Sequence, residues 1–139
     1  MQIRAFHPSD QDAVIAVWQA CDLTRAWNDP RKDIARKLTV QPELFVIGLQ
    51  KDELIASAMF GYEGHRGWVN YLAVHPTHQR KGHASTLMHW GEEVLKARGC
   101  PKINLQVRSS NAAVIAFYQS LGYGIDEVTS LGKRLITDN

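Results

Sequence analysis

The chain opens with a pattern that predicts a short strand followed by a helix. Residues 3–6 alternate between apolar and polar, as a half-buried strand does. Ser9 and Asp12 then resemble the capping box that begins a helix. The apolar residues that follow recur at the spacing of one helical face: Val14, Val17, Trp18 and Cys21. We therefore expect this face to lie against the core.

A second helix is predicted after a break at residues 23–28. Asp29-Pro30 gives the preferred order of an N-cap followed by a first-turn proline. Ile34 and Leu38 fall on one side of this helix and are expected to point inward. Pro42 ends the segment, because proline cannot continue a helix.

Three strands are predicted in the middle of the chain. Residues 44–49 and 54–60 are apolar runs separated by the polar turn 50–53, which is typical of a hairpin. A second turn, 61–67, contains three glycines and leads into a strand over 68–74.

The strand over 68–74 continues through a basic loop into a helix over 84–99. A helix start presents unpaired backbone N–H groups at the positive end of the helix dipole, which suits phosphate. Gly82 favours close approach of a phosphate because it has no Cβ. The spacing is neither that of a nucleoside-triphosphate loop nor that of a dinucleotide loop. A solvated basic turn that only caps a helix is the alternative.

The remaining pattern completes a mixed α/β fold. It predicts a strand over 102–107, a helix over 111–121 with Asn111 as N-cap, and closing strands over 123–128 and 131–136. The order β-α-α-β-β-β-α-β-α-β-β favours helices on both faces of a mixed sheet. We expect a single domain over residues 1–139, since no linker or internal repeat divides the chain.

Composition favours an ordinary globular domain, with 45% hydrophobic and 22% charged residues. The net charge of +2 is too small to favour nucleic acid as a partner, and the cluster around Arg80-Lys81 better suits a small polyanion. The chain has no signal-peptide core and no apolar run of the ~20 residues that a membrane span needs. We therefore expect a cytoplasmic protein with no nucleic-acid or membrane partner.

Cysteine and histidine spacing does not indicate a metal site. Cys21 and Cys100 lie in no C-x-x-C or Cys/His array, so neither a disulfide nor a zinc site is expected. His75, His78 and His83 have neither the i, i+4 spacing nor the partner carboxylates of a zinc site. We expect no metal and interpret these histidines as loop residues near phosphate.

Two blocks of the sequence together resemble the GNAT (GCN5-related N-acetyltransferase) superfamily. The first, Gln79-Arg80-Lys81-Gly82-His83-Ala84, is similar to the pyrophosphate-binding signature Q/R-x-x-G-x-G/A, and it follows a strand and opens a helix as the family requires. The second block, residues 111–123, comes next in the family's order. Residues 27–30, 61–67 and 130–135 extend the likeness over nearly the whole chain, to the small bacterial YpeA-type acetyltransferases.

The resemblance implies the GNAT fold, in which acetyl-CoA enters a gap between two splayed central strands. The backbone N–H groups of residues 80–85 would hold the pyrophosphate of coenzyme A. Val74 would bond the pantetheine arm, and Asn111 would contact it as well as cap its helix; capping alone is the alternative. The implied cofactor-binding residues are Leu72, Val74, Gln79, Arg80, Lys81, Gly82, His83, Ala84, Ser85, Asn111 and Tyr118.

Leu72 and Tyr118 are the catalytic residues that the resemblance implies. The backbone N–H of Leu72 would polarise the thioester carbonyl, and a preorganised donor of this kind supplies a few kcal/mol. Tyr118 aligns with the general acid that returns a proton to the coenzyme A thiolate. Its reference pKa near ~10 is close to the ~8.5 of a thiol, so a phenol is a sensible donor. Core packing is the alternative for Tyr118, because it shares a stripe with Val114.

The sequence leaves the general base open. An amine is mostly protonated at neutral pH and must lose a proton before it attacks. Where the ribosomal-protein N-terminal alanine acetyltransferase carries a basic Glu, this chain has Gln106, and an amide cannot act as a base. The remaining candidates are Glu63, His65 and Asn70, the last only through an ordered water. Trp27 is the aromatic residue expected to wall the acceptor site.

We expect an enzyme that transfers the acetyl group of acetyl-CoA directly to an amine in a ternary complex, without an acyl-enzyme. The acceptor classes are a small-molecule amine and a protein N-terminus or lysine. The alternatives are a ribosomal-protein-type N-terminal acetyltransferase and a non-catalytic acyl-CoA sensor, which the missing carboxylate at both usual base positions favours. The sequence leaves open whether the protein forms a homodimer, in which the closing strands of two copies could pair.

Overall fold

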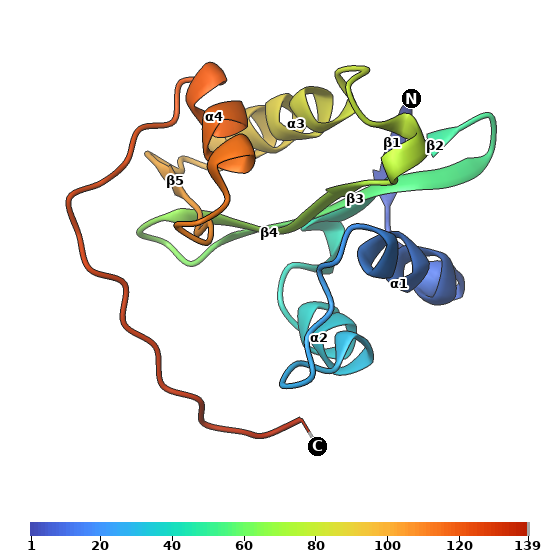
Figure 1. The fold of residues 1–139 in the computed structure, drawn as a ribbon, viewed down its shortest axis with the longest axis horizontal. Helices are drawn as coiled ribbons and strands as arrows, with labels where there is room; N and C mark the ends of the chain where they lie inside the picture. Colours follow the sequence, from blue (N-terminus) through green and yellow to red (C-terminus); the bar gives the residue numbers. More distant parts are fainter. Residues whose placement is uncertain (139) are drawn as a thin grey trace.

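The computed structural model describes residues 1–138 as one sheet with helices on both faces (Figure 1). Helices α1 and α2 cover one face, and α3 and α4 cover the other (Figure 1). The elements are β1 Gln2–Ala5, α1 Gln11–Ala20, α2 Pro30–Lys37, β2 Phe45–Gln50, β3 Glu53–Tyr62, β4 Gly67–Val74, α3 His83–Ala97, β5 Ile103–Asn104 and α4 Ala112–Ser120. Short 3-10 helices lie at Pro8–Asp10, Pro42–Leu44 and Pro76–His78.

The sheet has the strand order β1-β2-β3-β4-β5. Strands β1 to β4 are antiparallel, whereas β5 runs parallel to β4 and pairs only with its first two residues, Gly67 and Trp68. The two strands therefore part before β4 reaches its end at Val74. This confirms the predicted fold class and the gap between the central strands.

Each face of the sheet has its own hydrophobic core. One core packs β3 and β4 against α3, with Leu87 and Met88 fully buried. The other packs the sheet against α1 and α2 around Trp18, which is also fully buried. The Trp18 indole N–H donates to Ser57 Oγ at 2.8 Å, so its polar atom is satisfied inside the core.

Of the three helix N-caps that the sequence predicts, two are confirmed. The Asp29 carboxylate accepts from the Arg31 N–H at 2.9 Å, and Asn111 Oδ1 accepts from the Val114 N–H at 3.3 Å. The prediction at Ser9 and Asp12 is wrong. A 3-10 turn precedes α1, and the His7 N–H donates to Asp10 Oδ2 at 2.9 Å. Pro8 begins this turn, so the capping carboxylate falls at Asp10.

The two predicted closing strands, over 123–128 and 131–136, are wrong. Residues 121–138 form neither helix nor strand, and the predicted strand over 102–107 is reduced to Ile103–Asn104. A strand needs a neighbouring ladder, and the last ladder of the sheet ends at Asn104. The large apolar residues of this tail are therefore exposed: Ile125, Val128, Leu131, Leu135 and Ile136.

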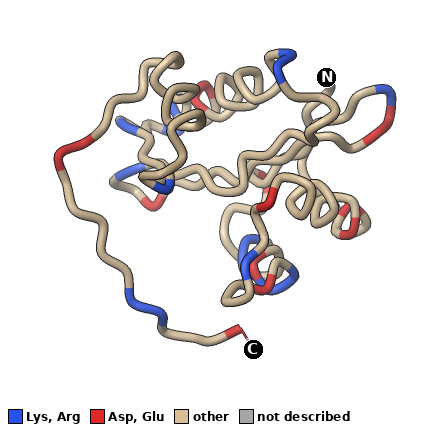
Figure 2. Tube along the Cα trace, in the orientation of Figure 1, with Lys and Arg blue, Asp and Glu red and all other residues tan. Residues whose placement is uncertain are grey.

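This C-terminal tail, residues 121–138, leaves α4 on one face of the sheet and ends beside α2 on the other (Figure 1). Lys and Arg residues near its end lie on the same side of the molecule as the charged residues of α2 (Figure 2). Within residues 1–138, the helices are all too short or too polar to cross a membrane.

Candidate functional site

A β-bulge interrupts β4 at the point where the strand has left β5. Ser57 pairs with Ala73 and Met59 pairs with Asn70, so Tyr71 and Leu72 together oppose a single residue of β3. Tyr71 has a φ of 51°, which is unusual for a residue with a side chain. A bulge leaves backbone groups of the extra residue outside the ladder. The bulge contains Leu72, whose N–H stays a prediction for the thioester contact.

The loop after β4 builds the start of α3 from two residues in the left-handed region. Arg80 has a φ of 62° and Gly82 a φ of 83°. The helical bonds of α3 begin with the Thr86 N–H on the Gly82 carbonyl at 3.0 Å, so the first-turn N–H groups, of residues 83–85, point out of the helix end. A Cβ on Gly82 would meet no atom within 4 Å. The structure therefore requires glycine here for its φ, and not for space.

Charge at this loop comes from Arg80 and Lys81, which are both exposed. Burial, followed by the positive charges of the N-terminus, His78 and Lys81, lowers the pKa of His83. His75 has a local structural contact, because its Nδ1 accepts from the Thr77 N–H at 3.2 Å. Gln79 closes the loop by donating its side-chain amide to the Val74 carbonyl at 2.9 Å.

Tyr118 lies on the inner face of α4, in the core shared with α3. Its ring packs edge-on against those of Phe117 and Tyr123, with centroid distances of 5.1 and 5.7 Å. Burial raises the pKa of Tyr118 to about 12, so its hydroxyl keeps its proton at neutral pH. Packing and proton donation are therefore compatible at this position. Asn111, at the exposed start of the same helix, caps it.

On the opposite face of the sheet, Tyr71 joins the bulge to α2. Its ring stacks on Trp18 with a centroid distance of 3.8 Å, and its hydroxyl donates to Asp33 Oδ2 at 2.6 Å. Burial and the Asp33 carboxylate raise the pKa of Tyr71. Arg36 donates to the other oxygen of Asp33 at 3.1 Å. Asp33 carries no signal of this contact in the sequence, since only the fold brings residues 33 and 71 together.

Trp27 lies in the loop between α1 and α2, with 54% of its surface exposed. The guanidinium of Arg108, which follows β5, lies 6.0 Å from the centroid of the Trp27 ring. The tail and Arg36 complete an open hollow of about 560 Å³ beside this ring. Trp27 thus faces the segment after β5, and its role as a wall of the acceptor site stays a prediction.

The candidate bases named from the sequence do not gather at the bulge. Glu63 and His65 are exposed in the β3–β4 turn, where the Glu63 carboxylate accepts from the His65 and Arg66 N–H groups. That turn is at the opposite end of β4 from Leu72. Asn70 is exposed and directly precedes the bulge. In residues 1–138, no cluster of three or more His, Cys, Asp or Glu side chains is arranged around a metal position.

A gap between parallel strands, a bulge beside it and an open helix start define an acetyltransferase of the GNAT type. The chain belongs to the acetyltransferase (GNAT) family, whose family model matches residues 11–123. It is 50% identical over 139 residues to acetyltransferase SG1711 of Sodalis glossinidius, covering 99% of this chain and 98% of that protein. It is 49% identical over 138 residues to acetyltransferase YE1169 of Yersinia enterocolitica, with the same coverage.

Solved structures show the same fold. Ard1 from Thermoplasma volcanium superposes with a TM-score of 0.81 at 23% identity, covering 90% of this chain and 83% of that one. The ribosomal-protein-S18-alanine N-acetyltransferase from Escherichia coli gives 0.72 at 28% identity, covering 87% and 76%. The PaiA N-acetyltransferase from Thermoplasma acidophilum, solved in complex with coenzyme A, gives 0.71 at 17% identity, covering 92% of each chain.

Proposed function

We propose that this protein is an N-acetyltransferase that passes the acetyl group of acetyl-CoA directly to an amine. One observation carries the proposal: β4 contains a bulge beside its gap with β5, and the loop 75–82 then leads from the end of β4 to the open N-terminus of α3. The bulge would thus offer an N–H donor for a thioester, and the start of α3 would offer N–H donors for a pyrophosphate. The structure of PaiA with coenzyme A supports the choice of donor.

The residues at the strand end fit coenzyme A. The first-turn N–H groups of α3, with the charges of Arg80 and Lys81, would hold the pyrophosphate. Coenzyme A supplies the activated acetyl group as a thioester. The backbone of β4 from Leu72 to Val74 has no strand partner on the β5 side and would bind the pantetheine arm through groups other than the Val74 carbonyl, which accepts from Gln79. Asn111 lies at the start of α4.

In the transfer step, the amine nitrogen attacks the acetyl carbonyl carbon, and the carbon–sulfur bond breaks as the amide forms. The Leu72 N–H stabilises the negative charge on the carbonyl oxygen. The Tyr118 hydroxyl gives its proton to the departing thiolate, which suits a phenol that is protonated at neutral pH.

The proton of the attacking amine needs an acceptor, and Asp33 is a carboxylate joined to the bulge residue Tyr71 by a hydrogen bond. We infer that this proton passes to Tyr71 Oη while the Tyr71 proton moves to Asp33 Oδ2, 2.6 Å away. Glu63, His65 and a water held by Asn70 are the alternatives that the sequence offers. Asp33 also weakens the case for a non-catalytic acyl-CoA sensor, which rested on a missing base.

The test is calorimetric binding of acetyl-CoA, followed by measurement of free thiol with a panel of amines. Binding with amine-dependent thiol release would support the proposal. Binding without release from any amine, including peptide N-termini and lysine peptides, would favour a sensor. A chain that does not bind acetyl-CoA would overturn the assignment of the loop at Gln79–Ala84.

A further inference from the structure

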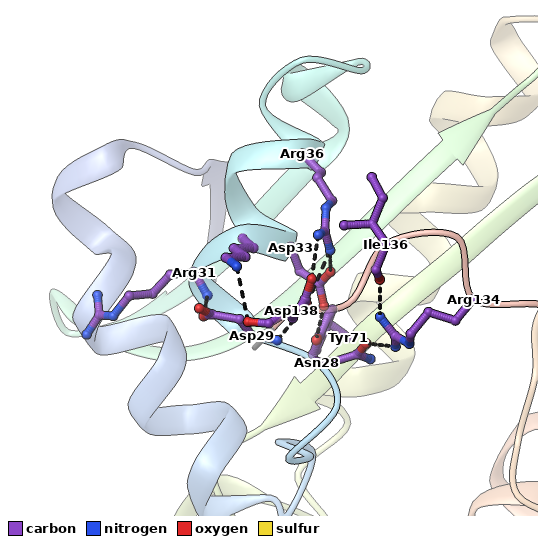
Figure 3. Close-up of polar contacts among 10 residues, drawn as sticks. Asn28, Asp29, Arg31, Asp33, Arg36, Tyr71, Arg134, Ile136 and Asp138 are labelled. Carbon is purple, nitrogen blue, oxygen red and sulfur yellow. Dashed lines mark hydrogen bonds and ion pairs between the residues drawn. The ribbon is translucent and has the colours of Figure 1, made fainter.

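The structure contains a built site for a carboxylate, and the chain itself fills it. Asp138 Oδ1 accepts from Arg36 Nη2 at 2.6 Å, and Asp138 Oδ2 accepts from the Asp29 N–H at 2.7 Å (Figure 3). Lys32 donates to the main-chain carbonyl of Asp138 at 3.1 Å. Only 1% of the Asp138 side chain is exposed. We call the Arg36 guanidinium, the Asp29 N–H and the Lys32 ammonium the carboxylate site.

The donors of this site are held in place by contacts of their own. Arg36 also donates to Asp33 Oδ1 at 3.1 Å, which holds its guanidinium in place (Figure 3). The Asp29 side chain caps α2 by accepting from the Arg31 N–H (Figure 3). A guanidinium and a backbone N–H at a helix start are both groups that recognise carboxylates. The hydrogen bonds from Arg36 and then from the Asp29 N–H lower the pKa of Asp138 to about 2. The site therefore favours the ionised form of its occupant.

The occupant is attached through a tail that the fold holds weakly. Residues 121–138 have no helix or strand, and every residue from 124 to 137 is exposed. Near its end the tail is held by the carboxylate site and by Arg134, which donates to Asn28 Oδ1 (Figure 3). A free carboxylate therefore competes with a single side chain on an extended segment.

The carboxylate site is connected to the place of acetyl transfer. Arg36 contacts Asp33, and Asp33 accepts a hydrogen bond from the hydroxyl of Tyr71 (Figure 3). Tyr71 is part of the bulge that also contains Leu72. On its other side the site opens toward the exposed ring of Trp27, which lines the hollow together with Arg36. The carboxylate site, the apolar ring of Trp27 and the proposed proton acceptor Asp33 thus lie along one face of the molecule.

We propose that the acceptor carries a carboxylate as well as the reacting amine, and belongs to the amino acid class. Its carboxylate displaces Asp138 from the carboxylate site, and its side chain lies against Trp27. The Asp138 side chain then acts as an internal competitor. This inference rests on the proposed N-acetyltransferase function.

The test compares pairs of amines that differ only in the carboxylate, with the full chain and acetyl-CoA. L-Phenylalanine is paired with 2-phenylethylamine and L-leucine with 3-methylbutylamine, within a panel of all L-amino acids. We expect kcat/KM, read as thiol release, to be at least about tenfold higher for the acid of the preferred pair, as charge-assisted hydrogen bonds allow. Equal values within every pair would overturn the inference and leave the acetyltransferase function standing.

Substitutions test whether the preference for the acid arises at the carboxylate site. Arg36→Gln should abolish the preference for the acid, whereas Arg31→Gln, whose partner Asp12 is a surface carboxylate at 3.2 Å, should retain it. Asp138→Asn removes the competing charge and should lower KM for the acid by about tenfold while leaving the decarboxylated amine unchanged. A preference that survives Arg36→Gln would place the carboxylate elsewhere and overturn the assignment.

If no amine supports thiol release, the proposed acetyltransferase function fails. Direct binding of amino acids then tests the carboxylate site separately. Calorimetry with the Asp138→Asn variant should show that at least one of the L-amino acids binds. Adding Arg36→Gln to this variant should abolish that binding. Absence of binding by every amino acid, or binding that is insensitive to Arg36→Gln, would overturn the carboxylate site.

Discussion

The hydroxyl of Tyr71 and the carboxylate of Asp33 share a hydrogen bond of 2.6 Å that joins the bulge of β4 to helix α2. Tyr71 is held in a left-handed backbone conformation and stacks on Trp18. Its raised pKa keeps the shared proton on the phenol in the resting protein. In the proposed mechanism, this carboxylate from helix α2 takes the place of the one missing from the usual strand positions.

Asp33→Asn should lower kcat about 100-fold, because an amide does not accept the proton of the amine. The KM for acetyl-CoA should stay unchanged, since α3 and the loop before it are untouched. The pH dependence of kcat is the decisive readout, because a positioning role alone would leave its shape unchanged. Asp22→Asn is the matched control, as its side chain is 96% exposed. Full turnover with an unaltered pH profile would remove Asp33 from the mechanism.

Tyr118→Phe keeps the ring in the core and removes only the hydroxyl. Turnover should fall by at least about tenfold, while calorimetric affinity for acetyl-CoA changes by less than about twofold, because the proton is needed only as the thiolate leaves. Tyr62→Phe serves as the control, since its hydroxyl makes only long contacts, at 3.3 and 3.4 Å. Wild-type turnover in Tyr118→Phe would show that the residue only packs.

Gly82→Ala should weaken acetyl-CoA binding by about tenfold. A φ of 83° costs roughly 1–2 kcal/mol for a residue with a Cβ, so the loop relaxes away from the conformation that opens the first turn of α3. Gly64→Ala is the matched control, because Gly64 also has a positive φ, 105°, and also leaves free space for a Cβ, but lies in the β3–β4 turn. Equal affinity of the two variants would contradict the role of the loop.

Local signals in the sequence were sufficient to predict the four helices and the strands β1 to β4. The N-caps at Asp29 and Asn111 depend on residues within one turn, and so does the glycine at position 82. The same kind of signal was misleading in the tail. The pattern over 131–136 predicts a strand, but strand formation also needs a neighbouring ladder, and the last ladder of the sheet ends at Asn104.

The contacts of α2 with β4 and with the tail were not predictable, because the residues that make them are distant in the sequence. Asp33 and Tyr71 are 38 residues apart, and Arg36 and Asp138 are 102 apart. No periodicity links such pairs, since they meet only after the sheet and α2 have packed. The bulge was equally hidden, because Tyr71 is not a residue type that favours a positive φ.

Gly91→Ala should destabilise the fold by about 1–3 kcal/mol, because the added methyl group overpacks the core. A Cβ at this position would lie 2.1 Å from Cε1 of the buried Phe60. Denaturant unfolding measures the loss, with Gly132→Ala as the control, since a Cβ there would meet no atom within 4 Å. A loss below about 0.5 kcal/mol would show that Phe60 moves aside freely.

The ion pair between Arg4 and Asp10 should make stability depend on pH. Arg4 donates to both oxygens of Asp10, at 2.8 and 3.0 Å, and only 13% of the Asp10 side chain is exposed. These hydrogen bonds lower the pKa of Asp10 from its ordinary 3.8. A carboxylate with a lowered folded pKa contributes stability above its ordinary pKa and loses it as the pH falls through the folded value.

Arg4→Gln should therefore lower the free energy of unfolding by about 1 kcal/mol at pH 7, and by progressively less below pH ~4. Denaturant unfolding of both proteins between pH 7 and pH 3 measures this difference. Arg25→Gln is the control, because the carboxylate of its partner Asp22 is exposed and 3.7 Å away, so little change is expected at any pH. A constant difference between wild type and Arg4→Gln across this range would mean that Arg4 stabilises the first turn by packing, since only the ionic contribution disappears when Asp10 is protonated.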